Sequence, residues 1–265
     1  EYVSPGNGLL NVEQGDLNLP GRGMDLAITR VYSSPYGFRS TSPYEYDNYT
    51  GANLGYGWSL NFPWLGANYL HLTDGEAYPY NWNGSSFVYH GATNFDLVHN
   101  MGGTYTLFMP SGIQYGYASN ESLLSITDRT GNNTLSFKYV SGHISQITDT
   151  IGRTVTFSYT GSELTSISTG GRTWSYGYLD NNLVSSTDPA GRVTRYEYND
   201  AINRWLLTGI IYPTSGGVTY TYGSAPIGTE VKTYYVTSIN NYASPMASSL
   251  SSSTSIAYDI VNGAV

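Results

Sequence analysis

The sequence predicts an all-β protein in which an antiparallel β-hairpin repeat strip follows a cap of strands and loops. Turn signals ending in glycine recur about every twenty residues, at Gly131, Gly152, Gly171 and Gly191. Each is followed by a strand pattern that ends in paired aromatic residues. We find no capping box that opens an apolar stretch with helical spacing. One such unit cannot bury its own apolar face, so stacked neighbours must supply the core.

The first predicted region, residues 1–68, is the N-terminal cap. Residues 9–20 and 25–32 alternate apolar and polar side chains, which predicts two strands joined by a turn. Residues 33–53 are polar and rich in Ser, Tyr, Pro and Asn. This segment is longer than most loops, so we expect it to be functional or mobile.

The second predicted region, residues 69–223, contains the hairpins and the regular repeats. Asn83-Gly84 lies between alternating segments and predicts a tight hairpin turn. In the third region, residues 224–265, we expect terminal strands. A Ser-rich linker is predicted over 247–254 and a last strand over 255–261.

The repeat turns hold acidic residues that suggest a carboxylate ladder for Ca²⁺ or catalysis. An aspartate at the start of a turn more often accepts hydrogen bonds from its own backbone, and we favour that interpretation. The repeat-turn residues are Asp128, Gly131, Asp149, Gly152, Gly171, Asp188 and Gly191.

The paired aromatic residues recur in register with the repeat. We expect cross-strand packing from them, although exposed tyrosines can also stack against sugars. The repeat-aromatic residues are Phe137, Tyr139, Phe157, Tyr159, Tyr176, Tyr178, Tyr196 and Tyr198.

Composition excludes several functional classes. Aromatic residues make up 15% of the chain but charged residues only 11%, against roughly 25% in ordinary soluble domains. The net charge is −8, with few and scattered basic residues, so we expect no nucleic-acid partner. There is no cysteine, which excludes disulfides and thiolate metal sites. No apolar run is long enough to span a membrane, and no signal peptide is visible. Because Glu1 is not an initiator methionine, we expect a processed chain or an excerpt of a longer one.

Four Asn-x-Ser/Thr sequons lie in predicted turns or loops, where a glycan would project into solvent. A chain rich in Asn, Ser and Thr also produces such triplets by chance. The candidate N-glycosylation sites are Asn48, Asn83, Asn120 and Asn132.

The sequence offers no catalytic or metal-binding constellation. The histidines lie alone rather than in a cluster with ligand spacing; they are His71, His90, His99 and His143. Glu45 and Asp47 are neighbouring carboxylates that we interpret as solvated loop residues. No serine lies in a nucleophile elbow and no glycine-rich phosphate loop is present. We therefore expect a protein that is not an enzyme, with no catalytic residue, cofactor or metal.

Three segments together resemble the RHS (YD-repeat) family. The closest is Asp188-Pro-Ala-Gly-Arg-Val-Thr-Arg-Tyr-Glu-Tyr198; residues 6–26 and 54–59 are similar to the region that precedes RHS repeats. The resemblance spans about residues 5–223. It implies a large secreted or cell-surface β-structure whose hairpin strip coils into a hollow shell. In bacterial toxins that shell encloses a C-terminal toxic domain, and in animal adhesion proteins it belongs to a receptor.

The chain departs from this family pattern in two ways. About five or six repeats are present, too few to close a shell, and neither a self-cleaving aspartyl motif nor a toxin domain follows them. We expect a non-catalytic extracellular structural protein: a segment of an RHS-type shell, or a fibre subunit that self-associates or pairs with further RHS sequence. The open sheet edges near Glu1 and Val261 would carry this assembly. The alternatives are the shell of a polymorphic toxin and a carbohydrate-binding surface adhesin with glycan partners.

Overall fold

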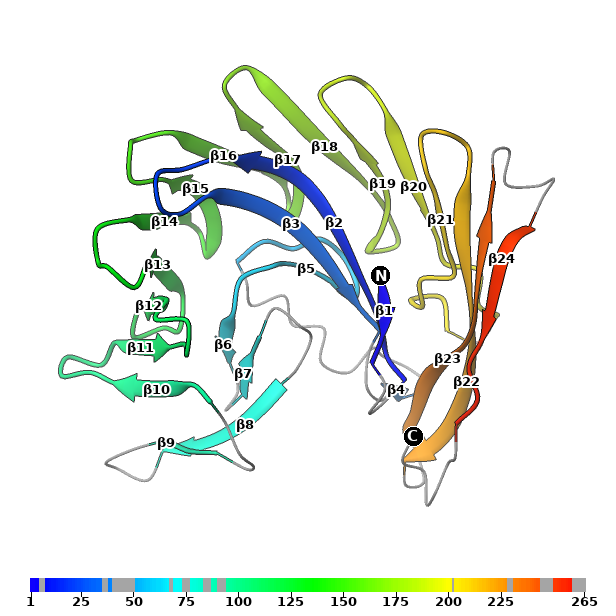
Figure 1. The fold of residues 1–265 in the computed structure, drawn as a ribbon, viewed down its shortest axis with the longest axis horizontal. Helices are drawn as coiled ribbons and strands as arrows, with labels where there is room; N and C mark the ends of the chain where they lie inside the picture. The colour runs from blue at the N-terminus through cyan, green and yellow to red at the C-terminus, as the bar shows by residue number, and fades with distance from the viewer. Residues whose placement is uncertain are drawn as a thin grey trace.

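The computed structural model shows an all-β protein in which one long sheet arches over a smaller one (Figure 1). It describes residues 1–4, 8–34, 38–39, 51–66, 69–72, 77–82, 87–89, 94–201, 203–227, 231–243 and 250–258. Within these ranges every regular element is a strand. All the paired strands of the named sheets are antiparallel, and the long sheet does not close into a barrel. The predicted fold class is therefore confirmed.

The long sheet is the repeat strip. Fifteen strands, β10 to β24, pair with one another in the order in which they follow in the chain, and β4 joins the strip by pairing with β23. The strands are β10 (Asp96–His99), β11 (Tyr105–Phe108), β12 (Gln114–Tyr117), β13 (Leu123–Thr127), β14 (Thr134–Val140), β15 (His143–Thr148), β16 (Thr154–Thr160), β17 (Glu163–Thr169), β18 (Arg172–Leu179), β19 (Asn182–Thr187), β20 (Val193–Glu197), β21 (Gly209–Ile211), β22 (Gly217–Ile227), β23 (Val231–Tyr242), β24 (Leu250–Ser255) and β4 (Phe38–Arg39).

Two four-stranded sheets precede the strip. The N-terminal sheet has the order β1-β2-β3-β5, and its long hairpin β2–β3 lies on the inner side of the arch (Figure 1). The second sheet, β6-β7-β8-β9, follows it in the chain. Their strands are β1 (Tyr2–Val3), β2 (Leu10–Leu19), β3 (Leu26–Ser33), β5 (Trp58–Leu60), β6 (Trp64–Gly66), β7 (Tyr69–His71), β8 (Ala77–Trp82) and β9 (Phe87–Tyr89).

A β-bulge recurs in successive hairpins of the strip. In β14–β15, Lys138 pairs with Gln146 but the next residue, Tyr139, pairs with Ile144, so Ser145 is the extra residue. The same shift occurs in the hairpins β12–β13, β16–β17, β18–β19 and β22–β23. A bulge bends its strand and increases the local twist. We attribute the arch of the strip to this repeated bulge.

The bulge also sets which side chains face the core. In β14, β16 and β18 the buried residues alternate with exposed ones, whereas the strand that follows has buried residues three positions apart, as in Ile144 and Ile147 or Leu164 and Ile167. The extra residue brings both members of each pair to the inner face. The apolar core consequently runs along the inner face of the strip from β10 to β23 and continues into the N-terminal sheet.

Residues 51–56 attach the N-terminal region to the bulged ends of the hairpins. The backbone carbonyl of Gly51 accepts a hydrogen bond from the amide of Ile144, and that of Asn53 accepts one from Leu164. The amide of Tyr56 then donates to the carbonyl of Asn181. This short segment therefore contacts three consecutive hairpins and holds their spacing.

The last described strand differs from the sequence prediction. We predicted a linker over 247–254, but residues 250–255 form β24. This stretch contains neither glycine nor proline, and the long strand β23 offers it an edge to pair with. The Ser253 hydroxyl donates to the Asn240 side-chain oxygen over 2.6 Å, which replaces apolar packing in this fully exposed strand. Residues 256–258 are not in a strand, and the rest of the predicted last strand lies outside the described residues.

Candidate functional site: a cleft over a buried arginine

A single bulged residue of the N-terminal sheet carries the buried carboxylate of the site. In the β2–β3 hairpin Gly15 pairs with Thr29 and Leu17 pairs with Ile28, so Asp16 is the extra residue. The bulge shifts the alternation of inward-facing and outward-facing side chains along β2 by one residue. Val12 and Leu17 therefore both face the core although five positions separate them. It also aims the Asp16 side chain towards the neighbouring strand β3.

Arg30 on β3 lies in the inward-facing row of that strand, between Ile28 and Tyr32. Its guanidinium donates two hydrogen bonds to the Asp16 carboxylate, at 2.7 and 2.9 Å. The side chains of Arg30 and Asp16 are only 2% and 5% exposed. A fork-to-fork pair of this kind has the geometry that arginine forms best with a carboxylate.

The remaining donors of Arg30 reach across to the repeat strip. The guanidinium donates to the Tyr196 hydroxyl at 2.8 Å and to the Ser186 hydroxyl at 3.2 Å. Tyr176 completes the network by donating to Asp16 over 2.7 Å. These bonds join strands β18, β19 and β20 to the N-terminal hairpin. We call the five residues Asp16, Arg30, Tyr176, Ser186 and Tyr196 the clasp.

Aromatic rings surround the buried cation. The Arg30 guanidinium carbon lies 5.3 to 5.6 Å from the ring centroids of Trp58, Tyr176 and Tyr196. Burial alone would lower the pKa of Arg30, but Tyr196 and Asp16 more than offset it, and the pKa lies well above its ordinary value. Burial, followed by the charge of Asp16, raises the pKa of the Tyr176 phenol. The clasp therefore keeps its arginine charged and this tyrosine neutral at physiological pH.

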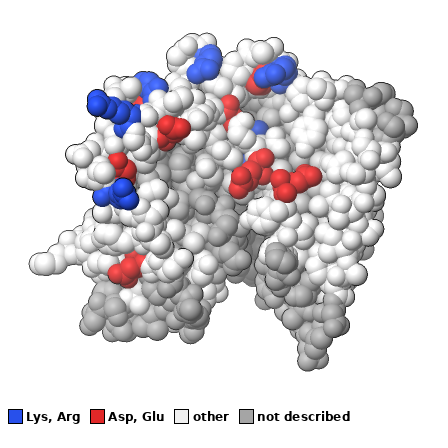
Figure 2. Space-filling view, viewed as in Figure 1, with Lys and Arg blue, Asp and Glu red and all other residues white. Residues whose placement is uncertain are grey.

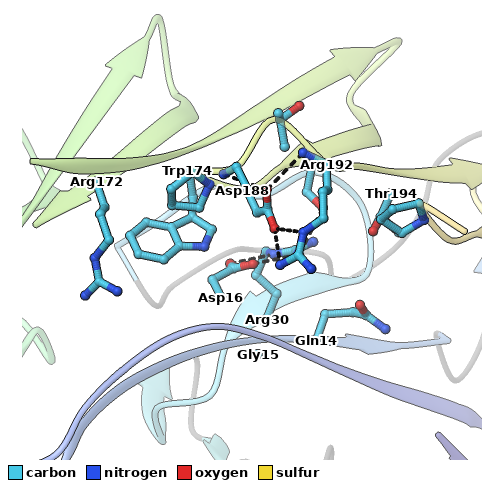
Figure 3. A pocket seen from close by; sticks show the side chains of 14 residues that line it. Gln14, Gly15, Asp16, Arg30, Arg172, Trp174, Asp188, Arg192 and Thr194 are labelled. Carbon is cyan, nitrogen blue, oxygen red and sulfur yellow. Dashed lines mark hydrogen bonds and ion pairs between the residues drawn. The ribbon is translucent and has the colours of Figure 1, made fainter.

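A cleft of about 450 Å³ opens above the clasp (Figure 3). Gln14, Gly15 and Asp16 of β2 line its floor, together with Arg30. Its walls come from the strip: Arg172, Trp174, Ser186, Thr187, Asp188, Pro189, Ala190, Arg192, Thr194 and Pro213. The cleft thus lies where the cap meets two repeats, and both contribute polar side chains to it.

The repeat-turn aspartates accept hydrogen bonds from their own turns. The Asp188 carboxylate accepts from the amides of Ala190 and Arg192, and Asp149 does the same with Ile151 and Arg153. Asp128 accepts from the amides of Thr130, Asn132 and Asn133 and from the Asn133 side chain. Asp149 and Asp188 also pair with the arginine four positions later, at 2.7 and 2.6 Å.

These hydrogen bonds favour the ionised carboxylates. The bond from the Asn133 side chain is the main reason that the pKa of Asp128 falls to about 2. The backbone amide of Arg192 does most to lower the pKa of Asp188. Burial opposes ionisation of Asp149, but its bonds with Arg153 prevail and lower its pKa as well. Carboxylates fixed in this way stabilise turns, and they are poor proton donors at neutral pH.

The repeat-turn glycines have left-handed backbones. Gly131, Gly152, Gly171 and Gly191 have φ angles between +74° and +85°. Residues with a Cβ rarely adopt this conformation, which explains the spacing of glycine in the sequence.

The repeat-aromatic residues divide into two kinds. The first of each pair is buried in the core: Phe137, Phe157, Tyr176 and Tyr196. The second is a tyrosine whose hydroxyl donates to a backbone carbonyl of the preceding hairpin. The donors and acceptors are Tyr139 to Leu123, Tyr159 to Ile144, Tyr178 to Leu164, Tyr198 to Leu183 and Tyr222 to Leu207, at 2.6 to 3.0 Å.

Four of the five acceptors, all except Leu207, lie beside a bulge. Ile144 pairs with Tyr139 after the register shift, and its carbonyl receives the hydroxyl of Tyr159. Leu164 pairs with Tyr159 and receives Tyr178 in the same way. Each hairpin is therefore tied to the one before it by a buried phenol, and burial raises the pKa of Tyr139, Tyr159 and Tyr178.

Several other predicted positions lie apart from the cleft. The candidate sequon residues Asn120 and Asn132 are exposed at turns, whereas Asn48 and Asn83 lie outside the described residues, as do His90, Glu45 and Asp47. The His71 imidazole stacks on Trp64 at 3.5 Å between ring centroids, and burial lowers its pKa to about 4. In the described part of the chain no group of three or more His, Asp and Glu residues could hold a metal ion.

Residues 179–216 match the family model described as RHS Repeat. This segment of the chain is therefore similar to an RHS repeat. The matched RHS segment contains β19, β20 and β21, the Asp188 turn and the tyrosines Tyr196 and Tyr198. No curated protein matches the chain. The part of the chain that the structure describes holds no helix that could cross a membrane.

The matched segment supplies Ser186 and Tyr196 to the clasp, and the sequence alone did not reveal the partners from the N-terminal hairpin. Asp16 and Arg30 were not among the predicted site residues. One signal was available: an arginine at position 30 interrupts the inward row that Leu26 and Ile28 begin. A charged side chain at a position that the strand pattern predicts to be buried requires a buried partner. The interruption of the apolar/polar alternation in β2 marks where that partner lies.

Proposed function

We propose that this protein, with its RHS-like repeat, is a non-catalytic structural protein, secreted or at the cell surface, that assembles through the open edge of its strip. The observation that carries the proposal is strand β24. It pairs with β23 on one side, it ends the strand order of the strip, and its residues are all exposed. An exposed edge strand presents unpaired backbone groups to which another strand can add.

Apart from a β-bulge at Ser251, the edge lacks the charged residues and prolines that proteins use to prevent such pairing. β24 has the sequence Leu-Ser-Ser-Ser-Thr-Ser, which contains no charged residue and no proline. On the face seen in Figure 2, charged side chains lie on the left, at the top and near the centre of the molecule, and the described residues drawn in white on the right-hand side include none. This uncharged edge favours addition of a strand from a second copy.

The sheet edge that we predicted near Glu1 is less open than the edge at β24. β1 is the outer strand of the N-terminal sheet, but the Glu1 carboxylate accepts a hydrogen bond from the Tyr220 hydroxyl of the strip. This end of the chain therefore lies on the inner side of the arch (Figure 1). We accordingly base the assembly proposal on β24 alone.

A structural role also fits the chemistry of the cleft. Its two carboxylates, Asp16 and Asp188, are each bound to an arginine, and Asp188 is held ionised. Asp188 is therefore not poised to donate a proton near neutral pH. The clasp instead joins cap and strip, which suits a protein that must keep its curvature.

Sedimentation velocity on the full chain tests the assembly proposal. We expect larger species as concentration rises, and we expect Ser251→Lys combined with Ser253→Lys to abolish them, since lysine protects edge strands. The control, Ser136→Lys combined with Ser158→Lys, makes the same change in charge at exposed positions of interior strands β14 and β16. A wild-type chain that stays monomeric at high concentration, or equal loss of assembly in both variants, would refute the proposal.

A further inference from the structure

The cleft over the clasp has the size and lining of a small-molecule site. Its volume of about 450 Å³ lies within the roughly 300–1,000 Å³ typical of ligand pockets. Strands from the cap form the floor and RHS strands form the walls, so the structure holds the cleft in shape before any ligand arrives (Figure 3).

Most charges in the cleft neutralise one another. Arg30 forms an ion pair with Asp16, and Arg192 forms one with Asp188. Arg172 differs, because no ion pair joins it to any carboxylate in the described residues. Its guanidinium instead lies over the Trp174 ring, 5.5 Å from the centroid. The aromatic ring orients the cation and leaves its charge unneutralised, at the side of the cleft seen in Figure 3.

The rest of the lining combines neutral polar groups with apolar surface. Thr187, Thr194 and Gln14 offer hydroxyl and amide groups that can both donate and accept hydrogen bonds. Pro189 and Pro213 supply apolar walls that cannot donate from their backbone. A ligand that suits this cleft has several hydroxyls, apolar C–H faces and one negative charge.

We propose that the cleft binds an acidic sugar, with its carboxylate paired to Arg172 and its hydroxyls bound by Thr187, Thr194 and Gln14. A planar guanidinium binds a carboxylate through two parallel hydrogen bonds, which gives both strength and orientation. A neutral sugar leaves Arg172 unpaired, and a second acidic group on the ligand meets Asp188 and Asp16. The inferred ligand is therefore a saccharide with one uronic acid. This binding activity is separate from assembly through β24.

Isothermal titration calorimetry on the full chain tests the assignment. The probe is the disaccharide of glucuronic acid and N-acetylglucosamine, and the neutral comparison is the disaccharide of two N-acetylglucosamines. We expect the acidic probe to bind at least about tenfold more tightly than the neutral one, and Arg172→Gln to remove that preference. Arg172→Lys, which keeps the charge without the planar fork, should fall between the wild type and Arg172→Gln.

Arg129→Gln is the matched control. Arg129 is an exposed arginine in the β13–β14 turn, outside the cleft. We expect this variant to bind like the wild type. Three results overturn the proposal: no binding of the acidic probe, equal binding of both disaccharides, or equal loss in Arg129→Gln and Arg172→Gln. Binding of an acidic dipeptide as tightly as the acidic disaccharide refutes the assignment to a sugar.

Discussion

Replacing Arg30 with methionine should destabilise the protein severely, because it leaves the Asp16 carboxylate buried with one partner. The Asp16 side chain is 5% exposed, and among the described residues only the Tyr176 hydroxyl, at 2.7 Å, still donates to it without Arg30. Breaking a buried ion pair by removing one member costs about 3–5 kcal/mol. We therefore expect Arg30→Met to lower the free energy of unfolding by about 4 kcal/mol.

Removing both charges should cost less than removing one. In Arg30→Met combined with Asp16→Leu no buried charge is left, but the Tyr176 hydroxyl loses its acceptor, at about 1–3 kcal/mol. Ser186 and Tyr196 keep each other as partners over 3.2 Å. The double variant should thus be about 2 kcal/mol more stable than Arg30→Met.

Urea unfolding followed by tryptophan fluorescence measures these differences, since Trp58 lies against Arg30. Arg192→Met is the control: it breaks a pair of similar length, but the arginine is 71% exposed. We expect it to cost at most about 1 kcal/mol. The reasoning is refuted if Arg30→Met costs no more than Arg192→Met, or if the double variant is less stable than Arg30→Met.

Three further predictions concern the repeats. Tyr159→Phe removes the 2.8 Å hydroxyl bond to Ile144 and should cost about 1 kcal/mol, with faster amide exchange in β15 and β16. Gly152→Ala places a Cβ at φ +85° and should cost about 1 kcal/mol in urea unfolding, more than Gly15→Ala, where φ is not positive and space is open. The hydrogen-bonded Asp128 has its pKa lowered from 3.8 to about 2, so its contribution to stability is complete above pH 4 and is lost as the pH falls towards 2. Melting temperatures of wild type and Asp128→Ala should therefore converge between pH 4 and pH 2.

Each of these predictions has an outcome that contradicts it. For Tyr159→Phe, the contradicting outcome is amide hydrogen exchange that becomes faster to the same extent in every strand of the strip. The Tyr159–Ile144 hydrogen bond joins only two adjacent hairpins, so its loss should act locally. For the glycines, it is equal destabilisation of the Gly152 and Gly15 variants. For Asp128, it is a difference in melting temperature that stays constant from pH 7 to pH 2.

The repeat could be predicted from the sequence because its signals are local. A left-handed turn requires a residue such as glycine, and an aspartate two positions before a free amide caps it, so the spacing of Asp188 and Gly191 predicts the turn by itself. Strand alternation then identifies the buried aromatic residues. These features depend on neighbours a few positions away, and the chain repeats them about every twenty residues.

The clasp depends on contacts between distant parts of the chain. Arg30 meets Ser186 and Tyr196 only because the strip bends back over the N-terminal hairpin. That bend arises from bulges, which appear in the sequence only as apolar residues spaced by three, such as Ile144 and Ile147. Strand alternation has a period of two, so a spacing of three does not by itself predict a strand.

Strand β24 was missed for a different reason. Its Ser-rich composition is typical of linkers, and no apolar face indicates a strand. Its pairing is decided by the free edge of β23, where Asn240 and Asn241 bond to its serines. Composition describes what a segment can bury, whereas an edge strand can form through backbone pairing alone.

Cysteine cross-linking tests the assembly claim most directly, because the chain has no cysteine of its own. A short bismaleimide would be applied to the full chain carrying Thr254→Cys in β24, and separately to the chain carrying Ser136→Cys in β14, which has neighbours on both sides. Edge-to-edge assembly predicts rapid, concentration-dependent dimers from Thr254→Cys and few from Ser136→Cys. Equal rates for the two variants, or no dimer from Thr254→Cys, would contradict it.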